Sequence, residues 1–317
     1  MHIIKDINDF EYDKKSVVTV GTFDGVHLGH LEIIEKLISI KKEKGLRSIV
    51  ITFEPHPQVV LRNKTKDIKI LSTLDEKLYI FKSLGIDIVY VINFTKGFSN
   101  TTAEEFYKNY LIDKIGLNDL VLGYDHMFGK NREGSFETLK ILSQKYEFTV
   151  DKIDEFKIDG EHISSTVIRK LLDEDGNVRK VKRILGRYFS LEGEVVEGKK
   201  LGKDLGYPTA NIEIFSEFKL IPKIGIYAVS IELDRKLHFG MMSIGKNPTV
   251  SSDDSIKLEV NIFDFDKDLY GKIITVNFID YIRDEKKFES LEELKKQMSF
   301  DKEISLKRIN EINNINN

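Results

Sequence analysis

Two histidines stand three residues apart in the stretch GTFDGVHLGH, where an apolar run gives way to a helical pattern. Positions three apart are neighbours on one face of a helix, so His27 and His30 could both reach a phosphate chain. A helix N-terminus attracts anions, and Gly21, Gly25 and Gly29 would let the backbone approach a ligand closely. Each histidine could donate a hydrogen bond to charge developing on a phosphoryl oxygen. The pattern predicts a phosphate site that works by positioning and charge stabilisation, without a covalent intermediate.

Two other interpretations of this turn compete with the phosphate site. The histidines could merely cap the helix and pack the turn, which is the better interpretation of a single histidine. They could also bind a metal, but the chain has no cysteine and no clear third ligand stands nearby. Two histidines, three glycines and a strand–helix junction in one stretch favour the phosphate site.

Hydroxyl side chains cluster at a second predicted helix start, in the stretch ISSTVIRKLL. Ser164, Ser165 and Thr166 stand at the start of the helix, and Arg169 follows three residues beyond Thr166. Alone, these residues are more typical of an ordinary helix cap with a surface arginine. In combination with the histidine turn, they predict further contacts to phosphate.

A third informative stretch, GKKLGKDLGYPTANI, combines glycines, lysines and oxygen ligands. It is not a Walker A loop, because the glycine spacing is one residue short and Asp204 stands where Ser or Thr is required. Its glycines and lysines could fold over a polyphosphate, and the oxygens of Thr209 and Asn211 suit Mg²⁺. A basic hairpin that ends in a capped turn explains the same residues about equally well.

The elements that must position these residues change in type along the chain. Apolar runs at 17–20, 48–53, 88–92 and 119–122 alternate with helical patterns near 30–44, 73–84, 102–115 and 135–146. This alternation predicts a parallel sheet with helices on both faces. A charged and helical segment, 171–185, then connects to the second half.

Short alternating strands follow after about residue 186 and predict an antiparallel sandwich or small barrel. The expected strands cover residues 190–196, 226–233, 236–244, 257–263 and 273–281. A final helical pattern at Leu291, Leu294 and Met298 closes the chain, with Ser290 as N-cap and Glu293 three residues on.

The composition is that of a soluble globular protein. A chain of 317 residues is long enough for two domains. The net charge of −3 and the mixing of both signs argue against a nucleic-acid partner. The absence of cysteine excludes disulfides, thiolate metal sites and a cysteine nucleophile, and fits a cytoplasmic protein. We expect no signal peptide and no membrane partner, because no run approaches the length of an apolar membrane span.

The motifs together carry a resemblance to a known family. GTFDGVHLGH resembles the HxGH signature of the nucleotidylyltransferase superfamily, in the form typical of bacterial bifunctional riboflavin kinase/FAD synthetases, and ISSTVIRKLL resembles its usual companion motif. The resemblance covers nearly the whole chain. It implies a Rossmann-like nucleotidylyltransferase domain at residues 1–185 and a β-barrel riboflavin kinase domain at residues 186–310, ending in a helix.

The resemblance implies two reactions and three substrates. The second domain would transfer the γ-phosphoryl group of ATP to riboflavin and give FMN. The first would transfer AMP from a second ATP to FMN and give FAD and pyrophosphate. In this first domain, the ATP contacts would come from Gly21, Phe23, Gly25, His27, His30, Ser164, Ser165, Thr166 and Arg169. FEPHP and GYDHMFGKNREG resemble its flavin-side segments, with Pro55, Pro57, Asp125 and Phe128 as flavin contacts.

In the kinase domain, GKKLGKDLGYPTANI resembles the glycine-rich loop and PTAN motif of riboflavin kinases. The implied ATP contacts are Gly198, Lys200, Gly202, Lys203, Thr209 and Asn211, and the last two would hold Mg²⁺. Lys203 stands where many relatives carry arginine, so the charge is kept but the bidentate fork is lost. Glu259 would be the catalytic base. Its alternation with Leu258 and Val260 would by itself make it solvent-facing.

Three rival hypotheses remain at this point. One half alone could be active, although both halves carry their motifs. The protein could be a flavin-binding regulator or carrier without turnover. It could also be an adenylyltransferase for another acceptor, such as a pantetheine or nicotinamide nucleotide, against which the second domain argues.

Overall fold

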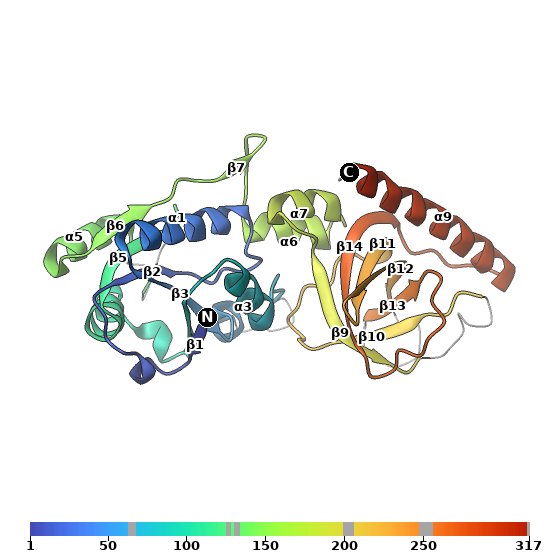
Figure 1. Cartoon of the computed structure of the whole chain (residues 1–317). Helices are drawn as coiled ribbons and strands as arrows, with labels where there is room; N and C mark the ends of the chain where they lie inside the picture. Colours follow the sequence, from blue (N-terminus) through green and yellow to red (C-terminus); the bar gives the residue numbers. More distant parts are fainter. Residues whose placement is uncertain (63–67, 125–127, 130–133, 199–205, 247–255, 316–317) are drawn as a thin grey trace. The chain divides into compact units, whose positions relative to one another are not determined.

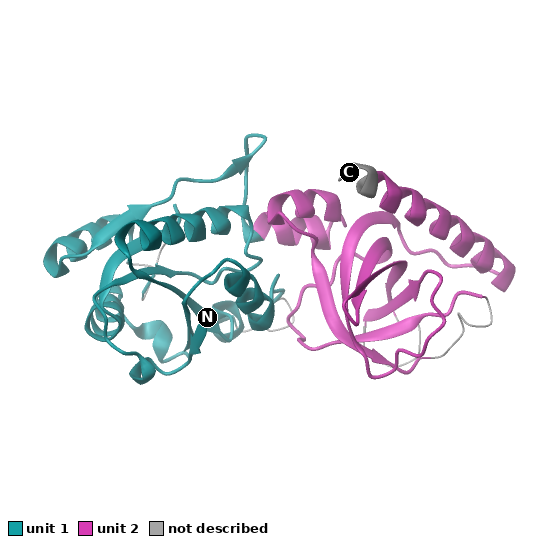
Figure 2. Cartoon of the chain, in the orientation of Figure 1, with its two compact units in different colours: residues 1–165 teal, residues 166–317 magenta. Residues whose placement is uncertain are grey.

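The computed structural model describes residues 1–62, 68–124, 128–129, 134–198, 206–246 and 256–315. The chain divides into two compact units, Met1–Ser165 and Thr166–Asn317 (Figure 2). The division falls before residues 185 and 186, where we expected the domain boundary. The connecting helices α6 (Ser165–Asp173) and α7 (Val178–Leu185) therefore belong to the second unit, except for the first residue of α6. The boundary between the functional domains stays a prediction.

A six-stranded parallel sheet forms the centre of the first unit (Figure 1). In spatial order its strands are β1 (His2–Ile4), β4 (Ile88–Asn93), β3 (Arg47–Glu54), β2 (Ser16–Val20), β5 (Leu117–Leu122) and β6 (Thr149–Lys152). All five pairings are parallel. The predicted parallel sheet is confirmed, and the short edge strands β1 and β6 add to it.

Helices cover both faces of this sheet, as the alternation predicted. They are α1 (Leu28–Lys44), α2 (Pro57–Leu61), α3 (Leu74–Ser83), α4 (Ala103–Phe106) with the π-helix η4 (Tyr107–Ile115), and α5 (Phe136–Tyr146). Val17 packs with Leu37 of α1 and Phe81 of α3 in one core cluster. Its neighbour Val18 packs with Leu111 of η4 in the other. Successive residues of a central strand thus face opposite helical layers.

Smaller elements complete the first unit. They are the 3₁₀ turns η1 (Ile7–Asp9) and η3 (Phe98–Asn100) and the hairpin of β7 (Lys157–Ile158) and β8 (Glu161–His162). The hairpin directly precedes the hydroxyl motif at Ser164.

A closed antiparallel barrel forms the second unit, so the predicted barrel is confirmed over a sandwich. Its strands are β9 (Ser190–Val196), β10 (Ala210–Ile214), β11 (Gly225–Leu233), β12 (Lys236–Lys246), β13 (Ile256–Ile262) and β14 (Ile273–Arg283), closed in the order β10-β13-β12-β11-β14-β9. β10 was not predicted as a strand.

No helix within the described residues is long and apolar enough to cross a membrane.

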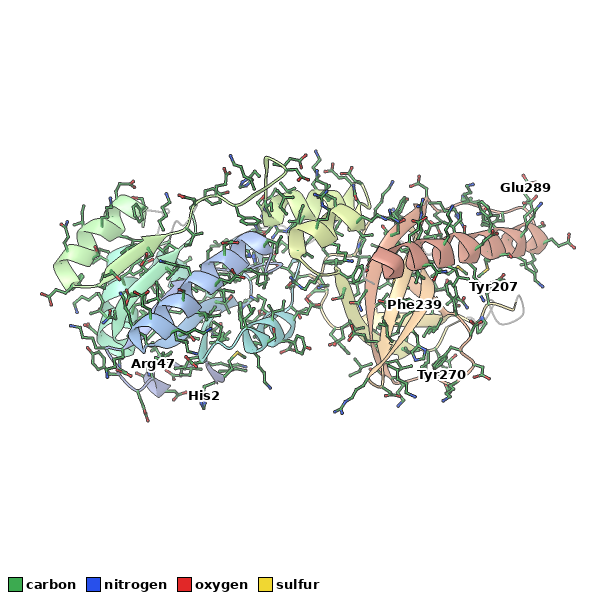
Figure 3. All side chains as sticks on the ribbon, turned by 45° about the horizontal axis from the view of Figure 1, so that its top comes forward. His2, Arg47, Tyr207, Phe239, Tyr270 and Glu289 are labelled. Carbon is green, nitrogen blue, oxygen red and sulfur yellow. The ribbon has the colours of Figure 1, made fainter. Side chains whose placement is uncertain are left out.

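The C-terminal helix α9 (Leu291–Ile315) lies along the outside of the barrel. Ile309 of α9 is buried in one cluster with Met241, Phe263 and Ile279 of the barrel unit. The partly buried rings of Tyr207 and Phe239 pack against this cluster (Figure 3). The Ser290 Oγ accepts a hydrogen bond from the Glu293 N–H at 3.2 Å, which is the predicted N-cap. The helix therefore covers one outer face of the barrel.

Candidate active sites

The histidine turn, which comprises residues 21–30, runs from the end of β2 into the first turn of α1. The rings of His27 and His30 stack with centroids 3.7 Å apart and planes 16° apart, so both lie on one face as predicted. His27 is the N-cap residue, but no residue of α1, all of which the structure describes, donates a capping hydrogen bond to its ring. A Cβ at Gly29 would lie 3.3 Å from His27 Nδ1, so glycine leaves room for the ring. The His27 side chain therefore does not cap α1, and the stacked pair fits both packing of the turn and a phosphate site.

The turn that precedes the histidines is strained. Phe23 and Val26 adopt positive φ angles of 49° and 37°, which are costly for side chains of this size and branching. Gly25, at φ 85°, occupies a conformation that glycine adopts without penalty. The Phe23 ring packs edge-on against His30, with centroids 5.3 Å apart. Surrounding contacts must fix such a turn.

One residue of the hydroxyl motif, Ser165, contacts this turn within the first unit. Ser165 Oγ donates a hydrogen bond to the Asp24 backbone carbonyl at 2.8 Å, across 141 positions of sequence. The buried Asp24 carboxylate accepts backbone hydrogen bonds from Leu71 at 2.8 Å and Ser72 at 3.0 Å. Ser164 directly precedes Ser165. The structure therefore brings Ser165 to the histidine turn.

Thr166 and Arg169 lie further along α6, in the second unit. Their contacts to the phosphates of ATP stay predictions.

Two of the predicted flavin contacts, Pro55 and Pro57, follow β3, and Phe128 follows β5. The Glu54–Pro55 peptide bond is cis, and Pro57 is the first residue of α2, where its missing N–H costs no helical hydrogen bond. Phe128 stacks against Phe53 at the end of β3, with centroids 6.1 Å apart and planes 19° apart. The centroid of its ring also lies 4.1 Å from that of Phe106. Phe128 is therefore half-buried within an aromatic cluster, which was not predicted from the sequence.

Two predicted kinase residues, Asn211 and Glu259, form a row with Ser243 across neighbouring strands. Asn211 of β10 and Ser243 of β12 both pair directly with Glu259 of β13. Directly paired residues of antiparallel strands project to the same face, so these three side chains share one face of the barrel wall. Lys257 Nζ lies 2.7 Å from Glu259 Oε1. The predicted base and one predicted metal ligand are therefore neighbours.

Gly198 lies against this row. A Cβ at Gly198 would come within 1.8 Å of Asn211 Nδ2, which no real structure tolerates. Glycine at this position lets the backbone that follows β9 approach the Asn211 amide closely.

Glu259 faces a cavity of about 280 Å³, which contradicts the solvent-facing placement inferred from its alternation. The alternation itself is correct, because Leu258 and Val260 are buried on the other face. The cavity is lined by residues of the barrel, of the segment after β14 and of α9: Thr209, Ile226, Met241, Met242, Ser243, Lys257, Glu259, Asn261, Arg283, Glu285, Lys286, Phe288, Leu294, Met298 and Asp301. It combines apolar walls with polar groups around Glu259 and Thr209.

One ion pair ties α9 to the rim of this cavity. Arg283 Nε and Nη2 donate to the two Asp301 carboxylate oxygens at 2.8 and 2.6 Å, and Gln297 Nε2 donates to Asp301 Oδ1 at 2.9 Å. The Asp301 side chain is only 2% exposed. This pair was not predicted from the sequence. An acidic residue on the barrel-facing side of an otherwise amphipathic helix was the available signal.

Asn261 was also missed. It follows Glu259 on the same face, lines the cavity and donates through Nδ2 to the Pro208 carbonyl at 2.7 Å. Residues two apart on a strand project to the same face, so the spacing from Glu259 could have identified Asn261 from the sequence.

Four predicted site residues lie outside the described residues: Asp125, Lys200, Gly202 and Lys203. Among the described residues, no group of three or more His, Asp or Glu side chains could hold a metal ion. Thr209 and Asn211 offer a hydroxyl and an amide oxygen. This hard but sparse donor set fits a cation that takes its other ligands from water and phosphate.

Two family models match the chain one after the other. A family model described as FAD synthetase matches residues 9–167, and one described as riboflavin kinase matches residues 185–309. A bifunctional riboflavin kinase/FMN adenylyltransferase of Listeria monocytogenes is 38% identical over 92% of this chain and 91% of its own length. A relative of the same description from Buchnera aphidicola is 40% identical over 95% of this chain and 96% of its own length.

A solved structure shares the architecture. A crystal structure titled as a macrolide-efflux protein from Streptococcus pneumoniae matches with a TM-score of 0.86 and 33% identity, over 96% of this chain and 97% of that one. Two family models in tandem, and relatives aligned along nearly the full length, show that this chain belongs to the bifunctional riboflavin kinase/FMN adenylyltransferase family.

Proposed function

We propose that the two compact units divide the two reactions of this family between them. The protein is a bifunctional enzyme that phosphorylates riboflavin with ATP to FMN and adenylylates FMN with a second ATP to FAD and pyrophosphate. Adenylyl transfer belongs to the unit with the histidine turn, and phosphorylation to the barrel unit. The observation that carries this assignment is that each unit brings its own predicted site residues together, the stacked His27 and His30 in one and the paired Asn211 and Glu259 in the other.

In adenylyl transfer, the stacked pair of His27 and His30 would donate hydrogen bonds to the phosphates of ATP. Gly21, Phe23 and Gly25 form the turn that lets the backbone approach them. Ser165, held on the Asp24 carbonyl, supports the placement of Ser164 and Ser165 beside this turn. Thr166 and Arg169 would add a hydroxyl and a positive charge. The step needs positioning and charge stabilisation rather than a covalent intermediate.

FMN would bind beside the carboxyl ends of the parallel strands, where open α/β sheets bind their ligands. Pro55 and Pro57 stiffen the loop that follows β3. Phe128, half-buried and stacked on Phe53, offers an aromatic face to an isoalloxazine ring. Asp125 would supply a polar contact.

In the kinase unit, the Glu259 carboxylate would accept the proton of the attacking riboflavin hydroxyl. The ion pair with Lys257 fixes its orientation. Gly198, Lys200, Gly202 and Lys203 would cover the phosphates of ATP. The apolar side of the cavity suits a planar ring, and its polar side, next to Glu259, suits a hydroxylated chain.

Phosphoryl transfer from ATP needs a divalent metal, which bridges the phosphates and neutralises developing charge. We propose Mg²⁺, held by Thr209 and Asn211. The proximity of Asn211 to Glu259 supports this assignment.

We also propose that the enzyme works in the cytoplasm, because a chain without cysteine depends on no disulfide.

A flavin time course with matched variants tests the assignment. Riboflavin, ATP and Mg²⁺ should give FMN first and FAD later. His27→Ala should stop the series at FMN, with FAD formation reduced by about 10²–10³, the cost of losing one charge-stabilising donor. Glu259→Gln should slow FMN formation by about 10²–10⁴ while supplied FMN is still converted to FAD.

Two variants serve as controls. His2→Ala changes an exposed histidine of β1, and Glu213→Gln changes an exposed glutamate of β10, so both should leave the two rates unchanged. FAD formation at the wild-type rate in His27→Ala, or FMN formation at the wild-type rate in Glu259→Gln, would contradict the assignment. Riboflavin that binds without ATP consumption would instead favour the regulatory hypothesis.

A further inference from the structure

A buried lysine that was not predicted as a site residue contacts the histidine turn. Lys77 belongs to α3, which a capping box of Thr73 and Glu76 fixes at its N-terminus. Lys77 is only 2% exposed. On α3 it shares the buried side with Phe81, four residues on. A lone charge at a core-facing position was the signal in the sequence.

The Lys77 amine holds the turn by two hydrogen bonds. Nζ donates to the Thr22 carbonyl at 3.2 Å and to Thr52 Oγ1 at 3.1 Å. Thr52 Oγ1 also donates to the Thr22 carbonyl at 3.2 Å. The three groups join α3, the end of β3 and the turn after β2. Lys77 therefore fixes the peptide that immediately precedes Phe23.

The orientation of this peptide matters for the site. In a trans peptide the carbonyl and the next N–H point in opposite directions. With its carbonyl held by Lys77, the Thr22–Phe23 peptide directs the Phe23 N–H away from α3. Phe23 and Val26 have positive φ angles, and such strained residues persist only where neighbours fix them. Lys77 is one of these fixing contacts, as Ser165 is for the Asp24 carbonyl.

The charge of Lys77 is not neutralised by contact. Among the described residues, Lys77 forms no ion pair within 4.0 Å, and both of its hydrogen-bond acceptors are neutral oxygens. Burial holds the pKa of the Lys77 amine below its usual value, because the opposing effect of the Asp24 and Glu54 charges is smaller. Burying a lysine in this way costs stability, and such groups cluster at functional sites.

We propose that Lys77 is a positioning residue of the adenylyl-transfer site. It holds the Thr22 carbonyl so that the strained turn keeps the shape that presents His27 and His30, and it adds positive charge beneath the bound phosphates. This inference rests on the proposed function of the histidine turn.

Steady-state kinetics of FAD formation from supplied FMN and ATP test the proposal. Lys77→Gln keeps hydrogen-bond donors but removes the charge, and should raise the KM for ATP by about tenfold or more. Lys77→Arg keeps the charge and should fall between wild type and Lys77→Gln. Lys82→Gln changes an exposed lysine of the same helix and should leave KM unchanged. FMN formation from riboflavin should be unaffected in all three.

Different results separate this proposal from a structural role and from failure of the underlying assignment. An unchanged KM for ATP in Lys77→Gln, or equal losses of kcat alone in Lys77→Gln and Lys77→Arg, would overturn it. Circular dichroism shows whether Lys77→Gln folds. Thr52→Val removes the second hydrogen-bond acceptor of Lys77 with little change of shape, so it should also raise the KM for ATP. This second variant tests the proposal even if Lys77→Gln does not fold. An unchanged KM in Thr52→Val counts against the proposal. His27→Ala belongs in the same series: if it forms FAD at the wild-type rate, the function assigned to the turn fails, whatever Lys77 does.

Discussion

At the scale of single residues, Gly198 offers a direct test of the kinase row. Gly198→Ala would place a methyl group 1.8 Å from Asn211 Nδ2, so the amide or the backbone after β9 must move. We expect FMN formation to fall by about tenfold or more, as for a misplaced catalytic contact. Conversion of supplied FMN to FAD should stay at the wild-type rate, because that reaction belongs to the other unit.

Gly97→Ala is the control for this substitution. A Cβ at Gly97 would meet only Thr95 Oγ1 at 3.5 Å, an ordinary contact, so both activities should persist. Wild-type FMN formation in Gly198→Ala would show that the close approach to Asn211 is not needed for phosphoryl transfer.

Residue types and spacing predicted some site residues and missed others for physical reasons. His27 and His30 could be predicted because both lie within one helical turn, where spacing determines the face. Glu259 was assigned to the correct face, but a helix more than thirty residues later covers that face, which local alternation cannot show. Lys77 was missed because lysine on a helix usually reaches solvent, and its acceptors lie on two other elements.

At the scale of elements, α9 should depend on the ion pair between Arg283 and Asp301. Asp301→Ala would leave the Arg283 guanidinium, only 15% exposed, without its carboxylate. Removing one partner of a buried pair should destabilise the barrel unit by about 3 kcal/mol. Because both residues line the cavity, the KM for riboflavin should rise as well.

Urea unfolding and FMN-formation kinetics check this prediction. Asp266→Ala changes an exposed aspartate of the same unit and should alter neither quantity. An unchanged KM for riboflavin in a destabilised Asp301→Ala would confine the pair to a role in stability.

Asp87 gives a pH-dependent link between α1 and the start of β4. Burial alone would raise the pKa of the Asp87 carboxyl, but the Lys41 ammonium at 2.7 Å and hydrogen bonds from Ser48 outweigh it and lower the pKa. The folded-state pKa is below the unfolded value, so this stabilisation is fully present above about pH 4. It is lost as the pH falls through the folded-state pKa.

Asp87→Asn should therefore lower the free energy of unfolding by about 1 kcal/mol at pH 7. The difference from wild type should shrink as the pH falls below 4. Urea unfolding at a series of pH values measures it. A difference that stays constant down to pH 2 would contradict the role of the carboxylate charge.

The elements themselves could be predicted where one pattern continued over many residues. The parallel strands were found because they are continuous apolar runs, and α1 because its apolar spacing is regular. β10 was missed because Pro208 and the following hydroxyl and amide residues are typical of a loop. Its strand character comes from pairing with β9 and β13, which are distant in the sequence.

At the scale of the whole molecule, the connecting helix α7 decides where the kinase unit begins. Val178, Val181 and Ile184 of α7 are buried, and Arg179 Nε lies 2.9 Å from Asp280 Oδ1 on β14. Burial raises the pKa of the Asp280 carboxyl against the effect of Arg179 and Arg308. A fragment without α7 would expose the apolar surface that the helix covers. It would also deprive Asp280 of Arg179, one of its two cations.

Two fragments make this a measurable difference. Residues 166–317 should fold, convert riboflavin to FMN and form no FAD. Residues 186–317, cut at the boundary expected from the sequence, should be less stable by about 3 kcal/mol or more, because each buried Val or Ile contributes about 1.5–3 kcal/mol. Urea unfolding and flavin chromatography of both fragments test this. Equal stability would place α7 functionally with the first unit. A shorter fragment that is unstable but active when folded would show that α7 supports the barrel without taking part in phosphoryl transfer.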